Sequence, residues 1–405
     1  MNILMVSDVY FPRINGVSTS IDTFRRELLA KGHHVTLIAP DYYAPSDDES
    51  HILRVPARYL KLDPEDRMMK SDFVMKLLPQ LREMKFDILH IQTPFVAHYL
   101  GVKLSKALNI PRVESYHTFF EEYLYHYIPF LPKSLMKGVA RRFSRYQCNN
   151  LHGMIVPSRP MFEVLQQYGI TTPAQIIPTG LEPYSFEEGN GDAFRDQYDI
   201  ARDRPTMLFV GRVAFEKNIG FLLQVTERVR REIGNVLFII AGEGPSLESL
   251  KTQASDMGLM PNMKFIGYLD RHRELASCYR AGNVFVFASR TETQGLVLLE
   301  AMAQGVPVVS IAEMGTKDVL LEGAGARIVP EDVPHFANTV VSLLRNMEAG
   351  RLLGEAGRDY ARSWSASCLA DRLVEFYAEV YTNYQSATVS STAGSSTVAT
   401  EASSA

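Results

Sequence analysis

The chain has 405 residues, enough for two or three domains, and 46% of them are hydrophobic, as in a globular protein with buried cores. A formal net charge of −4 argues against a dedicated nucleic-acid binder, which would be strongly basic. Three widely separated cysteines without a CxxC pair indicate neither a disulfide scaffold nor a zinc site. The start, MNILMVSD, is typical of a first strand rather than a signal peptide, and no stretch approaches about 18 consecutive apolar residues. We therefore expect a cytoplasmic protein, which could still lie on a membrane surface.

The first half of the chain alternates strand and helix signals. A helix predicted at 17–32 ends at Gly32, because glycine is a frequent residue just past a helix C-terminus. Alternation of this kind predicts a parallel sheet with helices on both faces. The predicted strands of this half are 2–7, 34–40, 87–92, 111–117, 153–158 and 175–180.

A second α/β series follows a polar stretch at 181–205, which indicates a linker and a short helix. Its predicted strands are 206–211, 236–242, 263–269, 283–289, 306–311 and 325–330. The fold class is therefore α/β, with two Rossmann-like, doubly wound domains facing an interdomain cleft. We predict an N-terminal domain at 1–185, a C-terminal domain at 186–364, a helix at 365–385 that packs back on the N-terminal domain, and a disordered Ser/Thr/Ala-rich tail at 386–405.

Two glutamates lie eight residues apart around the start of a predicted helix. Glu292 falls in the loop after strand 283–289, and Glu300 falls within the next helix. Ligands bind outside the carboxyl ends of strands in open α/β sheets, so these carboxylates could accept hydrogen bonds from a polyhydroxylated ligand. The helix start at Gln294 and Gly295 offers backbone N–H groups to an anion. The spacing alone is compatible with chance.

Other polar and glycine residues also fall at predicted strand ends. Arg212 and Lys217 follow strand 206–211 and could clamp a diphosphate, or simply form a solvated basic turn. Gly16 precedes a helix, and Gly242 lies in a turn with Gly244; each could let a backbone approach a phosphate or could serve an ordinary turn.

His117 ends strand 111–117. A lone histidine is more often structural, but at a strand end facing a cleft it could contact a ligand or handle a proton.

The segment 118–147 combines a dense aromatic run with a basic amphipathic helix. This pattern favours an interface with anionic lipid; the alternative is a core helix with a solvated basic face. The predicted membrane contacts are Phe119, Phe120, Lys133, Lys137, Arg141, Arg142 and Arg145.

With these motifs in order, the chain resembles the retaining glycosyltransferases of the GT-B fold, in the large family 4 group. The resemblance covers residues 1–380 and rests on the Glu292-x7-Glu300 pair, the Arg212 and Lys217 clamp, the Gly16 loop and His117. Asn15 precedes a single glycine where the family often has two, which leaves the phosphate contacts of this loop open. The stretches NGVSTSI, SYHTFFEEYL and TETQG are most similar to bacterial enzymes that glycosylate diacylglycerol.

The resemblance implies a role for each matching residue. Glu300 would accept hydrogen bonds from the donor ribose, Glu292 would hold the sugar hydroxyls, and His117 would lie beside the transferred sugar. The backbone near Leu296 and Val297 would meet the phosphate, while Arg212 and Lys217 would offset the charge on the departing diphosphate. It also implies that no metal or other cofactor is required.

The expected function is therefore retaining transfer of a hexose from a nucleotide sugar to a membrane lipid, with UDP-glucose as the first candidate donor and diacylglycerol as the acceptor. UDP-galactose and GDP-mannose are the next donors. We expect the enzyme to lie on the inner face of the cytoplasmic membrane. Alternatives are a soluble glycan, phosphatidylinositol or another small-molecule acceptor, a nucleotide-sugar epimerase, a sugar phosphorylase, and a non-catalytic binding protein.

Overall fold

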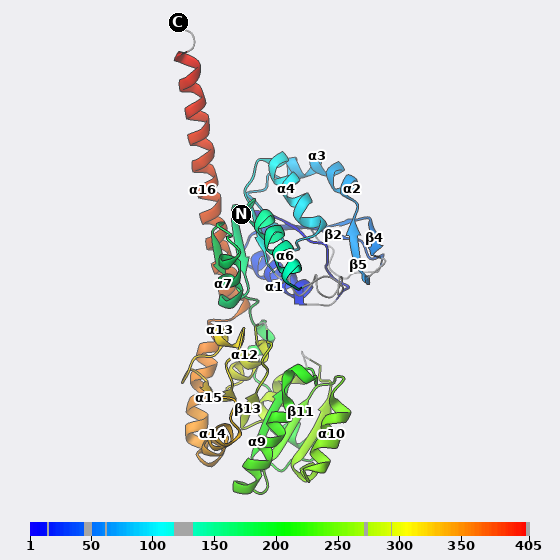
Figure 1. The fold of residues 1–405 in the computed structure, drawn as a ribbon, viewed down its shortest axis with the longest axis vertical. Coiled ribbons are helices and arrows are strands. Elements are labelled where there is room, and N and C mark those ends of the chain that lie inside the picture. The colour runs from blue at the N-terminus through cyan, green and yellow to red at the C-terminus, as the bar shows by residue number, and fades with distance from the viewer. Residues whose placement is uncertain are drawn as a thin grey trace. The chain divides into compact units, whose positions relative to one another are not determined.

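The computed structural model describes residues 1–13, 16–43, 51–60, 63–116, 133–270, 274–292 and 294–401, without the side chains of 59–60, 63–66, 133–137, 139–140 and 389–401. The chain forms two compact units (Figure 1). The N-terminal unit comprises Met1–Thr179 and Leu369–Ala405, and the C-terminal unit comprises Gly180–Cys368. The chain thus passes between units at 179/180 and 368/369, where the sequence predicts 185/186 and 364/365.

A parallel sheet of seven strands forms the centre of the N-terminal unit, in the order β3-β2-β1-β6-β7-β8-β9. Its strands are β1 (Asn2–Val6), β2 (His34–Pro40), β3 (Ile52–Val55), β6 (Ile88–Ile91), β7 (Arg112–Ser115), β8 (Gly153–Val156) and β9 (Ala174–Ile176). The strand order reverses between β1 and β6, which makes this pair a topological switch point. An antiparallel hairpin of β4 (Ala57–Leu60) and β5 (Asp63–Met69) lies outside the main sheet.

Helices cover both faces of this sheet because its strands are apolar on both sides. Alternate residues of β1 point to opposite cores. Ile3 joins the core shared with α1 (Gly16–Ala30) and α16 (Ala366–Glu401), and Leu4 joins the core shared with α4 (Val96–Leu108). The helices of the unit are α1 (Gly16–Ala30), α2 (Ser71–Lys76), α3 (Leu78–Glu83), α4 (Val96–Leu108), α6 (Lys133–Cys148), α7 (Arg159–Gln167) and α16 (Ala366–Glu401).

The long helix α16 returns the chain to the N-terminal unit. Phe376 and its apolar neighbours fill the core on the α1 face, and the Tyr377 hydroxyl lies 2.5 Å from His90 Nδ1. The sequence predicts a disordered tail from 386 onward, whereas the structure continues α16 through Glu401. Hydroxyl groups explain how Ser and Thr fit this helix: Ser386 and Thr388 donate to carbonyls one turn earlier.

The C-terminal unit contains a six-stranded parallel sheet in the order β12-β11-β10-β13-β14-β15. Its strands are β10 (Thr206–Val210), β11 (Leu237–Ala241), β12 (Met263–Gly267), β13 (Val284–Phe287), β14 (Val308–Ser310) and β15 (Ala326–Ile328). The order reverses between β10 and β13, the switch point of this sheet. Its helices are η1 (Pro183–Phe186), α8 (Gly191–Gln197), η2 (Phe215–Lys217), α9 (Ile219–Glu232), α10 (Leu247–Asp256), η3 (Met260–Asn262), α11 (Leu275–Ala281), α12 (Leu296–Ala303), α13 (Thr316–Val319), α14 (Val333–Arg345) and α15 (Met347–Arg362).

Two further properties concern membranes and metals. Over the described ranges, no helix is both long enough and apolar enough to cross a membrane. The same ranges contain no group of three His, Cys, Asp or Glu side chains arranged to hold a metal ion.

A buried carboxylate lies at the switch point of the N-terminal unit. Asp8 follows β1, accepts a hydrogen bond from the backbone N–H of Ala97 at 3.0 Å, and accepts a second from the Thr93 hydroxyl at 2.8 Å. Burial raises the pKa of Asp8 to about 7, although these hydrogen bonds oppose the shift. The carboxyl of Asp8 therefore retains its proton in the folded protein at pH values where an unfolded chain has lost it.

Asp8→Asn should make unfolding less dependent on pH. Between pH 4 and pH 7 the Asp8 carboxyl binds a larger fraction of a proton in the folded protein than in the unfolded chain, so its contribution to the unfolding free energy falls as pH rises. Asparagine carries no titrating proton, so the decline from pH 5 to pH 7 should be smaller by about 2 kcal/mol in the variant. Urea unfolding of both proteins across this range measures the difference; parallel pH profiles would contradict the assignment.

Candidate functional site

The predicted basic turn and the first glutamate lie on either side of the switch point of the C-terminal unit. Arg212 and Lys217 follow β10, and Glu292 follows β13. Because β10 and β13 are paired neighbours whose carboxyl ends meet at one edge of the sheet, the two loops adjoin. Ligands of doubly wound sheets bind at such an edge.

Lys217 and Glu292 meet directly. The Lys217 Nζ atom lies 2.5 Å from Glu292 Oε2, and each side chain is 19% exposed. The main chain holds Glu292 as well, because its carbonyl accepts a hydrogen bond from Gly315 at 2.9 Å. Arg212 is exposed on the same turn as Lys217. The structure therefore brings an ammonium group and a carboxylate, 75 residues apart in sequence, to one point.

Glu331 links the same two loops from the side. Its carboxylate accepts hydrogen bonds from Asn218, next to Lys217, at 3.0 Å and from Arg290 Nε, near Glu292, at 2.6 Å. The hydrogen bond from Arg290 lowers the pKa of Glu331, so this bridge stays charged. The sequence reasoning missed this residue; its position directly after predicted strand 325–330 was the available signal.

The sequence places the helix start after Glu292 at Gln294 and Gly295, whereas α12 begins at Leu296 with Gly295 as its N-cap. Gly295 adopts a left-handed φ of 82° and precedes α12. A side chain at Gly295 would crowd Leu298 and Thr316, at 3.1 and 3.2 Å from the added carbon. Leu296 and Val297 begin the helix, so their N–H groups belong to the first turn, where a helix has no acceptors of its own.

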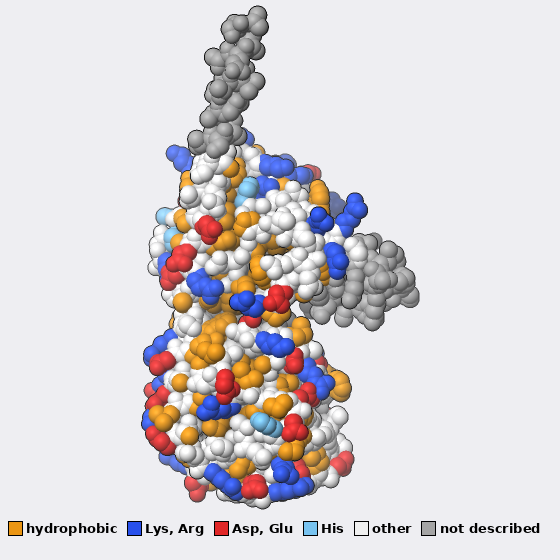
Figure 2. Space-filling view, turned by 60° about the vertical axis from the view of Figure 1, so that its left-hand side comes forward, with side chains coloured by type: hydrophobic (Ala, Val, Ile, Leu, Met, Phe, Trp, Pro, Cys, Tyr) orange, Lys and Arg blue, Asp and Glu red, His pale blue; other side chains and the backbone are white. Residues whose placement is uncertain are grey.

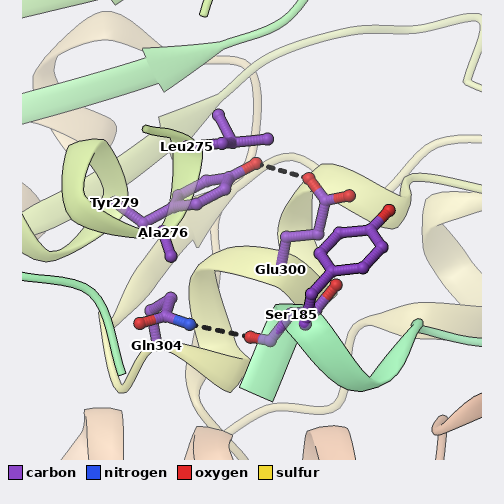
Figure 3. A pocket seen from close by; sticks show the side chains of 7 residues that line it. Ser185, Leu275, Ala276, Tyr279, Glu300 and Gln304 are labelled. Atoms are coloured by element: carbon purple, nitrogen blue, oxygen red, sulfur yellow. Dashed lines mark hydrogen bonds between the residues drawn. The ribbon is translucent and has the colours of Figure 1, made fainter. Parts of the chain in front are cut away.

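Glu300 lies on the buried side of α12, 5% exposed. Its Oε2 atom accepts a hydrogen bond of 2.8 Å from the hydroxyl of Tyr279 (Figure 3). Nearby, the Gln304 amide donates to the carbonyls of Ser185 and Glu187 at 2.7 and 2.8 Å and so fastens η1 to α12. The sequence reasoning identified Glu300 but missed Tyr279.

A small pocket opens beside Glu300. Its free volume of about 10 Å³ is close to that needed by one water molecule, so it is not a nucleotide pocket by itself. It is lined by Tyr184, Ser185, Leu275, Ala276, Tyr279, Glu300 and Gln304 (Figure 3).

The two remaining predicted glycines differ in what surrounds them. A methyl group at Gly242 would lie 2.0 Å from the carbonyl oxygen of Gly211, so this glycine lets two loops of the protein touch. A methyl group at Gly16, the first residue of α1, would meet no atom within 4 Å. Packing within the protein therefore explains why position 242 is a glycine. It does not explain the glycine at position 16, where a side chain would have room.

The other residues predicted for the N-terminal half are described in part. His117, Phe119 and Phe120 lie outside the described residues. Lys133 and Lys137 belong to α6, but their side chains are not among those described.

The remaining predicted membrane contacts, Arg141, Arg142 and Arg145, are exposed on α6. No carboxylate among the described residues forms an ion pair with any of them, and they line a hollow with Tyr146 and Tyr168. By contrast, Figure 2 shows acidic and basic side chains interspersed over the visible face of the C-terminal unit. The basic face of α6 is thus uncompensated by acidic partners in the described structure.

Two family models match the chain, one on each half. The model described as Glycosyltransferase Family 4 matches residues 14–184, and the model described as Glycosyl transferases group 1 matches residues 190–360. The second match contains Arg212, Lys217, Glu292 and Glu300.

Curated relatives and solved structures agree with these models. The alpha-monoglucosyldiacylglycerol synthase of Streptococcus pneumoniae is 33% identical over 76% of this chain and 71% of its own. The sulfoquinovosyl transferase SQD2 of Arabidopsis thaliana is 27% identical over 93% of this chain and 74% of its own. The Anabaena protein HepE, solved in complex with UDP, superimposes with a TM-score of 0.72 at 16% identity, over 94% of this chain and all of that one. This last likeness shows that the fold is that of the GT-B glycosyltransferases.

Proposed function

Because the chain belongs to the group 1 glycosyltransferases of family 4, we propose that it transfers a hexose from a nucleotide sugar to diacylglycerol, with retention of the anomeric configuration. UDP-glucose is the favoured donor. The observation that carries the proposal is the meeting of Lys217 and Glu292 at the switch point beside the start of α12. In this proposal a cation, a carboxylate that binds the sugar and the backbone donors of α12 surround one position.

In the proposed reaction, the bond between the anomeric carbon and the diphosphate oxygen breaks, and the acceptor oxygen forms its new bond on the same face. The leaving phosphate oxygen takes the proton from the acceptor hydroxyl. Lys217 and Arg212 offset the charge that grows on the diphosphate, and electrostatic stabilisation of this kind is often the largest catalytic contribution. We propose that these side chains and the first turn of α12 supply the compensating positive charge without a bound metal.

Each of the two glutamates is assigned to one end of the nucleotide-sugar donor. Glu292 holds hydroxyls of the transferred sugar, which requires its contact with Lys217 to open or be shared when the donor binds. Glu300 accepts hydrogen bonds from the ribose. The N–H groups of Leu296 and Val297 face the phosphates at the positive end of the helix dipole.

The assignment of a lipid acceptor rests on the names of two relatives and on the positive charge of α6. The Streptococcus pneumoniae relative is named for glucosyldiacylglycerol synthesis, and α6 presents three exposed arginines. The Arabidopsis relative is named for sulfoquinovosyl transfer, so another sugar or another lipid acceptor is the second candidate.

A donor-by-acceptor screen tests the proposal. The full chain is incubated with UDP-glucose, UDP-galactose or GDP-mannose and with vesicles containing diacylglycerol or phosphatidylinositol, or with a soluble oligosaccharide. Mass spectrometry identifies the product, and NMR of its anomeric proton reports retention. Glucosylated diacylglycerol with an α-linkage is expected. Products only with the soluble oligosaccharide, or conversion of the donor without any acceptor, would overturn the lipid assignment.

We further propose that α6 holds the enzyme on anionic lipid at the inner face of the cytoplasmic membrane. Each basic residue near an anionic surface contributes about 1 kcal/mol, so changing Arg141, Arg142 and Arg145 together to Gln should weaken vesicle binding by about 100-fold. Co-sedimentation with phosphatidylglycerol vesicles measures this. The matched control changes three exposed arginines of the C-terminal unit, Arg327, Arg345 and Arg351, to Gln. Equal effects of the two triple variants would argue against α6 as the contact surface.

A further inference from the structure

The position of Glu300 is costly for folding. Helix α12 reads LVLLEAMA, and Glu300 is its only charged residue. The carboxylate is nearly buried, and a buried ionised group is unfavourable unless hydrogen bonds or charges compensate it. An apolar side chain would pack at this position without that cost. The carboxylate therefore calls for an explanation other than stability.

Tyr279 compensates Glu300 from within the core. Its side chain is 1% exposed, and its ring packs against that of Phe285 with centroids 5.7 Å apart. The core thus fixes the ring, and the hydroxyl points at Glu300 Oε2 (Figure 3). A phenylalanine would fill the same space, so packing alone does not explain the hydroxyl.

We propose that Tyr279 is a positioning residue that presents the Glu300 carboxylate to the vicinal hydroxyls of the donor ribose. The inference rests on the proposed function, in which Glu300 contacts that ribose. A carboxylate offers about four acceptor sites, and the tyrosine hydroxyl occupies one of them. With one oxygen anchored, the plane of the carboxylate is set, so two adjacent hydroxyls meet acceptors that are already oriented.

The surroundings of the pair support a fixed geometry. Gln304, the residue that caps the C-terminus of α12 one turn after Glu300, holds η1 through the carbonyls of Ser185 and Glu187. The linker, α11 and α12 are therefore joined around the carboxylate. Tyr279 thus holds the carboxylate of Glu300, and Gln304 fastens η1 to the end of the helix that carries it.

The alternative is that Tyr279 only satisfies a buried carboxylate without any bearing on ligand choice. The discriminating measurement is the preference for UDP over 2′-deoxy-UDP, determined by isothermal titration calorimetry on the full chain. The wild type should bind UDP more tightly by about 10-fold, because the deoxy ligand lacks a hydroxyl that donates to a charged acceptor. In Tyr279→Phe this preference should fall to about threefold or less.

The quantity compared is the ratio of the affinities for UDP and 2′-deoxy-UDP. Both affinities are measured on the same variant, so a general loss of folded protein leaves their ratio unchanged. The control is Tyr360→Phe, which removes the hydroxyl of a half-buried tyrosine in the same unit that interacts with Trp364. A Tyr279→Phe protein that keeps the wild-type preference, or a Tyr360→Phe protein that loses it equally, would overturn the inference alone. Binding of neither UDP nor GDP by the wild type would instead overturn the proposed function and the inference with it.

Discussion

Replacing Lys217 with alanine is expected to lower kcat for hexose transfer by about 100- to 1000-fold, as the loss of one preorganised charge-stabilising donor does in other enzymes. The ammonium group is needed most when the diphosphate departs, since its negative charge then increases. The effect should therefore appear mainly in kcat, with a smaller rise in the KM for the donor. Steady-state kinetics with the donor and acceptor identified in the screen measure both constants.

The control for this variant is Lys251→Ala. Lys251 is a partly exposed lysine of the same unit that forms an ion pair with Glu248, so its removal changes the net charge equally. It should leave kcat unchanged. A Lys217→Ala enzyme with undiminished turnover would remove Lys217 from the catalytic machinery.

The contact between Lys217 and Glu292 provides a second line of evidence. If both residues act on one bound donor, the losses from Lys217→Ala and Glu292→Ala should not add in the double variant, because residues that act as a unit are strongly non-additive. An ion pair important only for folding would give a different pattern. The single variants would then lose thermal stability while the remaining folded protein kept its kcat.

Much of both sheets could be predicted because their central strands are short apolar runs bounded by turn residues. The run 284–287, buried throughout, is one such strand, and its pairing with β10 follows from the topology of doubly wound sheets. Strand β3, with the sequence ILRV, was missed because its arginine interrupts the apolar run. The hairpin β4-β5 was missed because DPEDR at the start of β5 is polar and has low strand propensity.

Part of the candidate site could likewise be predicted from the sequence, and part could not. A rule about strand ends suffices to place Lys217 and Glu292 near one another, because it concerns the backbone. The contact between Tyr279 and Glu300 could not be predicted, since the direction of the tyrosine side chain is fixed only by tertiary packing. The position of Glu331 directly after a predicted strand was a usable signal, but its contacts with Asn218 and Arg290 also depend on tertiary packing. Nothing in the spacing of Tyr279 and Glu300 marks them as neighbours.

Gly242 shows a further limit of sequence reasoning. Its place after a strand suggests a close approach to a nucleotide, yet the close contact in the structure is internal. The backbone φ of 140° is a conformation that residues with side chains rarely adopt, and a methyl group would overlap the carbonyl oxygen of Gly211 at 2.0 Å. Gly211 itself precedes Arg212, so the contact sets the start of the basic turn.

Gly242→Ala should therefore destabilise the C-terminal unit by about 3 kcal/mol or more and displace the turn that carries Lys217. Urea unfolding measures the first effect, and a fall in kcat/KM measured well below the unfolding midpoint reports the second. Gly234→Ala is the control: it lies in an exposed turn of the same unit, and an added methyl group there meets nothing within 4 Å. That variant should be neutral or slightly stabilised, because alanine reduces the entropy of the unfolded chain. A Gly242→Ala protein as stable as Gly234→Ala would show that the two loops can separate without cost, and the geometry at Lys217 would then need another support.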